Sequence, residues 1–249
     1  MLKAYRERGK EAITGDEYVL EQARLSWARG YLFRTILIDI LGLTACLATW
    51  RKNLNFFKLT LQSIWQLPAE VGWFERLNIA RNVFKKVGVR EIICWRDSDQ
   101  QIVLLDEGTL QTAHYLFVHV STEPDLNLTS TFTELVPLPH VIVYLRNETD
   151  VLIERTMSRQ HRRIGHRSPA EKALFVERAV NTFENLIQSS RFRSRLLILD
   201  VERDVIIQSD SQRDQSLDLV ADILRSGTDR TPPYHSTESI SGIDSLAVT

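Results

Sequence analysis

Paired cysteines, an excess of charge of one sign and a leader segment are all missing from this sequence. Cys46 and Cys94 stand in apolar surroundings without disulfide or metal-ligand spacing, so they predict reduced core residues of an intracellular protein. A formal net charge of −1 gives no global attraction to nucleic acid or acidic membranes. Charged residues within 3–11 leave no room for a signal peptide. We expect a cytoplasmic protein that binds no nucleic acid.

The apolar (43%) and charged (25%) content of the sequence is ordinary for a globular protein. In the first ninety positions most apolar residues recur at helical spacing. The expected segments are an exposed or frayed helix at 1–13, a helix from an N-cap at Asp16 to beyond Ile36, and helices at 53–66 and about 69–86. Two further stretches have no helical pattern: 91–95 predicts a small hairpin or a loop, and 122–138 predicts an irregular loop.

One apolar segment, 31–50, raises the question of a membrane. Arg34 and Asp39 lie within it, and each is costly at bilayer depth. The sequence therefore favours a buried helix of a soluble protein over a peripheral membrane contact, and it predicts no stable membrane insertion.

Three apolar runs are typical of strands buried on both faces: 102–106, 139–145 and 196–200. Helical segments at 148–158 and 168–190 lie between the last two runs, and Ser168-Pro169-Ala170-Glu171 is a strong helix-start signal. This alternation predicts an α/β fold with a parallel sheet flanked by helices. The expected organisation is a single domain at 1–226 (mainly helical at 1–88, sheet and lid at 89–210, a C-terminal helix at 211–226) and a disordered tail at 227–249.

The first of these runs leads directly into Asp106, Glu107 and Gly108. In open α/β sheets, ligands bind at the carboxyl ends of the strands. Strand, acid pair, glycine and helix are the local order of a metal- or phosphate-handling site. An ordinary strand-ending turn is an equally good interpretation of this stretch alone.

The ordered series of elements over about residues 70–210 resembles the P-loop nucleotide kinases, thymidylate kinase and its relatives in particular. The residues that carry the resemblance are the strand Pro139-His140-Val141-Ile142-Val143-Tyr144-Leu145, the helix ending Ile153-Glu154-Arg155-Thr156-Met157-Ser158-Arg159, then Phe175, Arg178 and Phe183, and the strand 196–200. Asp106-Glu107-Gly108 matches the acidic strand end of such enzymes.

This resemblance implies ATP and Mg²⁺ as cofactors and a nucleotide or another phosphorylated small molecule as ligand. It implies that Asp106 helps to hold the metal, that Glu107 holds or deprotonates the acceptor, and that Arg155 and Arg159 are lid arginines. Contacts to the cofactor would come from Gly108, Arg162, Arg163 and Arg167.

The basic segment 155–167 also has a physical interpretation of its own. Its five arginines carry planar, permanently charged groups that bind phosphate oxygens through two hydrogen bonds at once. A solvated basic loop is the alternative. A zinc site at His161 and His166 is disfavoured because neither has acid or cysteine partners at metal spacing, and nucleic-acid binding because no aromatic residue is interleaved.

The sequence departs from the family at its defining part. No Gly-x-x-x-x-Gly-Lys-Ser/Thr occurs among its scattered glycines, the strand that precedes this loop is missing, and Arg146 stands where the family usually has an acid. Either the chain is an N-terminally shortened form, which we favour, or the sheet has re-paired around the gap and ATP chemistry is lost.

Three functions remain open at this point. The first is a nucleotide-kinase-like phosphotransferase domain with little or no activity. The second is a non-catalytic module that binds a phosphorylated ligand or an acidic partner. In the third, the aromatic-rich helices at 27–84 form a subunit interface, which implies a homodimer.

Overall fold

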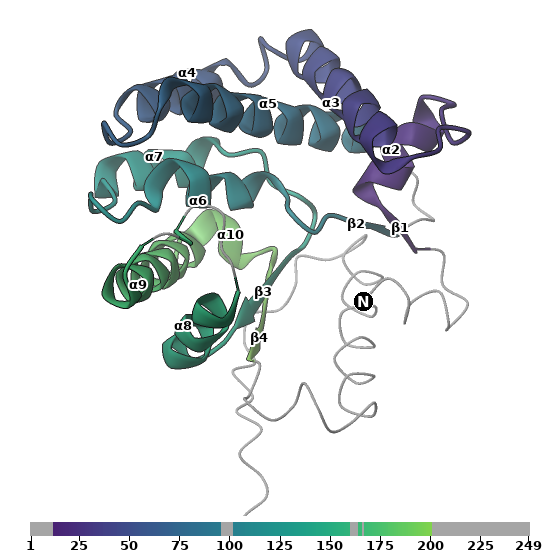
Figure 1. The fold of residues 1–249 in the computed structure, drawn as a ribbon. Coiled ribbons are helices and arrows are strands. Elements are labelled where there is room, and N and C mark those ends of the chain that lie inside the picture. The colour runs from purple at the N-terminus through teal and green to yellow at the C-terminus, as the bar shows by residue number, and fades with distance from the viewer. Residues whose placement is uncertain (1–11, 96–101, 160–163, 166, 201–249) are drawn as a thin grey trace, which may run out of the picture.

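The computed structural model describes residues 12–95, 102–159, 164–165 and 167–200 (Figure 1). Its elements, in chain order, are β1 (Ala12–Thr14), α2 (Gly15–Gln22), α3 (Tyr31–Ala48), α4 (Leu54–Trp65), α5 (Trp73–Trp95), β2 (Ile102–Leu104), the 3-10 helix η1 (Thr109–Gln111), α6 (Thr112–Phe117), α7 (Leu126–Leu135), β3 (Ile142–Arg146), α8 (Thr149–Ser158), α9 (Pro169–Ile187), α10 (Ser190–Arg193) and β4 (Leu196–Asp200). The protein is therefore mixed α/β, as predicted, and most of its described elements are helices.

The strands form two separate parallel ladders rather than one sheet. β1 pairs with β2, with Ala12 opposite Ile102, and β3 pairs with β4, with Ile142 opposite Leu196. Within the described residues no ladder joins β2 to β3. The prediction that the three apolar runs pair side by side is thus confirmed for β3 and β4 and wrong for β2, because β2 finds its partner upstream at β1.

Strand β1 and the break after α2 are the main differences near the N-terminus. Residues 12 and 13, expected at the end of an exposed or frayed helix, instead form a strand with residue 14, and Ala12 and Ile13 are buried. Thr14, not Asp16, caps α2: its hydroxyl accepts from the Glu17 amide at 3.2 Å, and Glu17 accepts in return from the Thr14 amide. The single helix expected past Ile36 is two helices: α2 ends at Gln22, Arg24 follows with a left-handed φ of 57°, and α3 begins only after Gly30 (φ 92°).

Two predicted irregular segments are helical. α5 continues to Trp95, so the expected hairpin or loop at 91–95 is its last turn. Helix α7 lies within the predicted loop 122–138, and Asp125 caps it by accepting from the amides of Asn127 and Leu128. Its many Thr and Ser residues favour non-helical structure locally, but burial of Phe132 outweighs this preference.

The remaining described helices agree with the sequence patterns. The expected helix at 53–66 is α4, and the one at 148–158 is α8. α9 begins with the predicted capping box, in which the Ser168 hydroxyl and the Glu171 carboxylate bond each other's backbone amides. The predicted C-terminal helix and tail, 211–249, lie outside the described residues.

Helices α3, α4 and α5 stack on one side of the molecule, α8, α9 and the β3–β4 ladder lie on the other, and α6 and α7 lie between them (Figure 1). The main core joins these layers. It contains Phe56 and Phe57 of α4, Val83 and Val87 of α5, Phe117 of α6, Phe132 of α7 and Leu186 of α9, all almost fully buried. Burying large side chains of this kind stabilises the fold by about 1.5–3 kcal/mol each.

Helix α3, the apolar segment of the sequence, is packed on α5 along one side only. Gly42 and Gly88 mark a crossing so close that a methyl group at Gly88 would overlap the Gly42 carbonyl. Asp39 is buried and forms ion pairs with Arg81 and Lys85 of α5. Only 28% of the residues of α3 are buried. The prediction of a buried helix is therefore wrong for the outer face of α3. α3 is also the one described helix long and apolar enough to cross a membrane, by length and composition alone.

Candidate functional site

The acid pair predicted from the sequence lies just beyond the carboxyl end of β2. Glu107 is held there by two partners: its Oε2 accepts from the Lys86 ammonium at 2.8 Å and from the Tyr115 hydroxyl at 3.3 Å. Lys86 comes from α5 and Tyr115 from α6, and the ammonium lies 5.1 Å from the centre of the tyrosine ring. Three elements therefore meet around one carboxylate, and the ring and the carboxylate share the lysine cation.

The charges at this point stabilise one another. The hydrogen bond from Lys86 lowers the pKa of Glu107, although partial burial opposes this effect. Burial lowers the pKa of Lys86, and the carboxylates of Glu107 and Asp106 oppose that shift. Glu107 is thus a fixed, ionised hydrogen-bond acceptor at neutral pH. The resemblance implies that Glu107 either holds the phosphate acceptor or removes its proton. Because a carboxylate with a lowered pKa is a weaker base, the first role suits Glu107 better than the second.

Asp106 differs from its neighbour because its side chain is exposed and forms no hydrogen bond or ion pair with any residue the structure describes. A magnesium ion at Asp106 would take its other ligands from water or from ligand phosphates, since the described residues contain no cluster of three metal-ligating side chains. Gly108 has an ordinary extended conformation (φ −74°, ψ −170°), and nothing lies within 4 Å of a methyl group placed there, so neither backbone conformation nor space requires a glycine.

The predicted phosphate-binding arginines fall into three groups. Arg155 and Arg159 lie at the end of α8, half-buried and exposed respectively, and neither forms an ion pair within the described residues. Arg167 is different: it bonds Glu70 at 2.5 Å and Glu171 at 3.0 Å. A ligand at Arg167 would have to compete with these carboxylates. The residues that lie outside the described part of the chain are Arg162, Arg163, His161 and His166.

Arg146, which departs from the family pattern, acquires a clear role at the ends of the β3–β4 ladder. Its guanidinium bonds both carboxylate oxygens of Glu184 at 2.9 Å and lies 3.8 Å from Asp200, its partner in the ladder. Burial, followed by the charge of Glu184, raises the pKa of the nearby Tyr144 to about 12. The strand-end acid at position 200 is therefore partly neutralised by an arginine of the adjacent strand.

Arg178, one of the residues that carry the resemblance, is used in tertiary structure. Its guanidinium donates to the carbonyl oxygens of His119, Val120 and Thr122 at 2.6–2.9 Å. This contact fixes the loop after α6 against α9. No sequence pattern marks it, because donor and acceptors are more than fifty residues apart.

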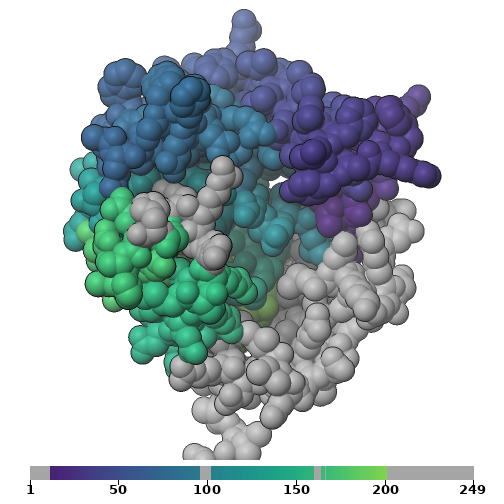
Figure 2. All heavy atoms as spheres, in the orientation of Figure 1, coloured from purple at the N-terminus to yellow at the C-terminus, as the bar shows by residue number. Residues whose placement is uncertain are grey.

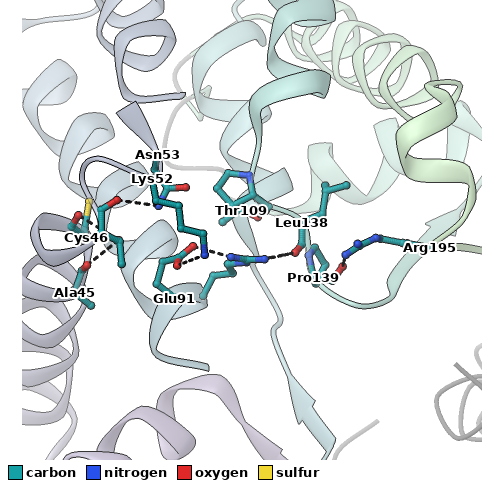
Figure 3. Close-up of polar contacts among 12 residues, drawn as sticks. Ala45, Cys46, Lys52, Asn53, Glu91, Thr109, Leu138, Pro139 and Arg195 are labelled. Atoms are coloured by element: carbon teal, nitrogen blue, oxygen red, sulfur yellow. Dashed lines mark hydrogen bonds and ion pairs between the residues drawn. The ribbon is translucent and has the colours of Figure 1, made fainter. Parts of the chain in front are cut away.

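A buried ion network, centred on Glu91 of α5, also escaped sequence reasoning (Figure 3). The Glu91 side chain is fully buried and accepts from Lys52 at 2.8 Å and from Arg90 at 2.6 Å. Arg90 in turn donates to the Leu138 carbonyl in the loop before β3.

Burial, with a further contribution from Glu91, raises the pKa of the neighbouring Cys46 to about 11, so this thiol is unreactive at neutral pH. Neither Cys46 nor Cys94 forms a disulfide, as predicted; Cys46 is buried in the core, whereas Cys94 is only partly buried.

Removing the Lys86 cation tests the electrostatics of the acid pair. In Lys86→Met we expect the pKa of Glu107 to rise toward its ordinary value of 4.5, because the hydrogen bond from Lys86 is the largest cause of its lowering. Carboxyl ¹³C chemical shifts followed through a pH titration measure this change. Tyr115→Phe is the control and should raise the pKa less. An unchanged Glu107 pKa in Lys86→Met would contradict this assignment.

Comparison with protein-family models, with curated proteins and with solved structures finds no match for this chain.

Proposed function

We propose that this chain is a nucleotide-kinase-like phosphotransferase domain with little or no turnover of its own. The observation that carries the proposal is the acid pair beyond the carboxyl end of β2, with Glu107 fixed by Lys86 and Asp106 open to solvent. Ligands of parallel α/β sheets bind at this end of the strands. An exposed aspartate beside a fixed glutamate can hold hydrated magnesium and orient a phosphate acceptor.

The arginines at the end of α8 support the same proposal. α8 follows directly from the carboxyl end of β3, and its Arg155 and Arg159 have no carboxylate partners within the described residues. Guanidinium groups of this kind neutralise the charge on phosphate oxygens during phosphoryl transfer. The two ladders also support the proposal. If the sheet of a nucleotide kinase lost the strand between β2 and β3, it would divide into two parallel pairs, such as β1–β2 and β3–β4.

Low turnover follows from the missing phosphate cradle. The sequence contains no Gly-x-x-x-x-Gly-Lys-Ser/Thr, whose backbone amides and lysine would hold the nucleotide phosphates. Lys86 is no substitute, since its ammonium is already bound to Glu107. Without these amide and lysine donors, the negative charge that develops on the transferred phosphoryl group in the transition state is not stabilised by fixed hydrogen bonds from such a loop.

A turnover assay tests this function. Purified chain is incubated with MgATP and with nucleosides or nucleoside monophosphates, and we expect at most trace product, which Asp106→Asn should remove. Sustained turnover would contradict the low activity that we propose, and trace product that is unchanged in Asp106→Asn would contradict the role of the acid pair.

The second candidate is a non-catalytic module that binds a phosphorylated ligand or an acidic partner. Arg155 and Arg159 favour it, because within the described residues neither cation has a carboxylate partner, and a partly or fully exposed cation of this kind can bind an anion. This function requires no metal. It predicts binding that weakens with salt and in Arg159→Ala but is unchanged when magnesium is removed.

A further inference from the structure

The outer face of α3 is a continuous apolar ridge. Four aliphatic side chains, spaced at helical intervals along it, are each more than half exposed: Leu32 (75%), Ile36 (55%), Ile40 (53%) and Leu47 (68%). Phe33 (44% exposed) widens the ridge at the start of the helix, and the ring of the exposed Trp27 lies beside it, with the two ring centroids 6.1 Å apart. Figure 1 places α3 at the edge of the molecule, on the side away from the β3–β4 ladder. Isolated exposed apolar residues are ordinary, but an aligned set marks an interaction surface.

A groove runs beside this ridge, between α2, α3 and the end of α5. It has a volume of about 390 Å³, and its lining includes Val19 and Gln22 of α2, Leu41, Thr44 and Ala48 of α3, and Ile92 and Trp95 of α5. The side chains that α3 contributes are mostly small. Ridge and groove therefore lie on adjacent faces of one helix, which belongs to the purple-to-blue part of the surface that projects at the right of Figure 2.

We propose that this face binds the same face of a second copy of the chain, with the ridge of each α3 lying in the groove of the other. A two-fold interface brings one surface patch against itself, so the patch must be self-complementary. A ridge with a parallel groove beside it meets this requirement, because helices pack by placing ridges into grooves. The proposal is independent of the proposed function.

Charge and area both favour a second copy. α3 contains only two charged residues, Arg34 and Asp39, and Asp39 is turned inward to Arg81 and Lys85. The ridge therefore carries no charged side chain. Two copies of it, related by a two-fold axis, can pack together without placing like charges beside each other. A standard interface buries about 800 Å² per partner. A large aromatic side chain has an area of about 150–250 Å², so six large side chains that are about half to three-quarters exposed, together with the groove, supply an area on the order of 600–800 Å².

A lipid surface fits this face less well. α3 is fixed to α5 by the Gly42–Gly88 crossing, and α5 carries charged side chains such as Arg81 and Lys85, so lipid cannot surround α3. Helices that lie on membranes usually have a polar face rich in Lys and Arg, whereas the opposite face of α3 is packed on protein. Lipid binding is accordingly an outcome that the experiment must distinguish.

Sedimentation velocity of the full chain tests the proposal. We expect a dimer at tens of micromolar, and we expect Ile36→Glu/Ile40→Glu to raise the dissociation constant at least a hundredfold with an unchanged circular dichroism spectrum. Leu126→Glu is the matched control, because Leu126 is equally exposed (69%) but lies on α7, and it should stay dimeric. If the double glutamate variant does not fold, Leu32→Gln/Leu47→Gln tests the same ridge with uncharged residues and should weaken the dimer at least tenfold.

Three results would overturn the proposal. A concentration of 100 µM is on the order of the dissociation constant of the weakest specific interfaces, so a wild-type chain that remains monomeric at this concentration excludes the dimer. A ridge variant that folds and remains dimeric places the interface elsewhere. A wild-type monomer that floats with phosphatidylcholine–phosphatidylglycerol vesicles, when the ridge variant does not, assigns the surface to lipid instead.

Discussion

Gly88→Ala is expected to lower the free energy of unfolding by about 2–3 kcal/mol, although alanine normally stabilises a helix relative to glycine by up to about 1 kcal/mol. The added methyl group would overlap the Gly42 carbonyl and lie 2.9 Å from the Cys46 amide nitrogen, both backbone atoms of α3. Backbone atoms cannot move aside as a flexible side chain can. α3 and α5 would therefore have to separate along their whole contact.

Urea denaturation followed by tryptophan fluorescence measures this loss. Gly72→Ala is the matched control, because nothing lies within 4 Å of a methyl group at Gly72, and its stability should change little. A Gly88→Ala variant as stable as the wild type would show that α3 and α5 do not cross at this point.

Glu91→Ala is expected to cost about 3 kcal/mol at neutral pH, because removing one partner of a buried ion pair leaves the other without compensation. Arg90, whose side chain is only 19% exposed, would lose its carboxylate, whereas Lys52 is 62% exposed and can be hydrated. Chemical denaturation at pH 7 measures the change. Glu177→Ala on the exposed face of α9 is the control and should lie within about 0.5 kcal/mol of the wild type.

The Glu91 network also gives a pH dependence of known sign. Burial alone would raise the pKa of Glu91, but the hydrogen bonds from Lys52 and Arg90 outweigh burial, and the net pKa is lowered below 4.5. A carboxyl whose pKa is lowered by folding stabilises the protein above its unfolded pKa and loses this contribution as the pH falls through the folded pKa. Glu91→Gln should remove that part of the acid sensitivity. A variant with the acid sensitivity of the wild type would contradict the assignment.

Local signals explain why parts of the fold were predictable. The start of α9 is encoded by Ser168, Pro169 and Glu171, which act on the backbone of their own turn. The five-residue runs of β3 and β4 are long and apolar enough to be recognised from the sequence. By contrast, β1 has only three residues, too few to show a strand period, and the Thr-rich α7 depends on burial of Phe132 that no local pattern reveals.

The candidate site divides in the same way. The position of Asp106 and Glu107 beyond a strand could be predicted, because strand and acids are contiguous in the sequence. The partners of the site residues could not. Lys86 is 21 residues from Glu107, and Glu70 is 97 residues from Arg167, so tertiary packing alone brings them together. For Arg167 this applies to Glu70 only, because its second partner, Glu171, lies four residues further along the chain.

Paired titrations of the full chain with a fluorescent ATP analogue, with and without magnesium, test the proposed function most directly. Because the chain has a solvent-exposed Asp106 but no glycine-rich phosphate cradle, we expect no saturable low-micromolar binding of the magnesium complex. Weak, salt-sensitive binding that does not need magnesium and is lost in Arg159→Ala would select the anion-binding module. Low-micromolar binding that requires magnesium and is abolished by Asp106→Ala would contradict the proposal.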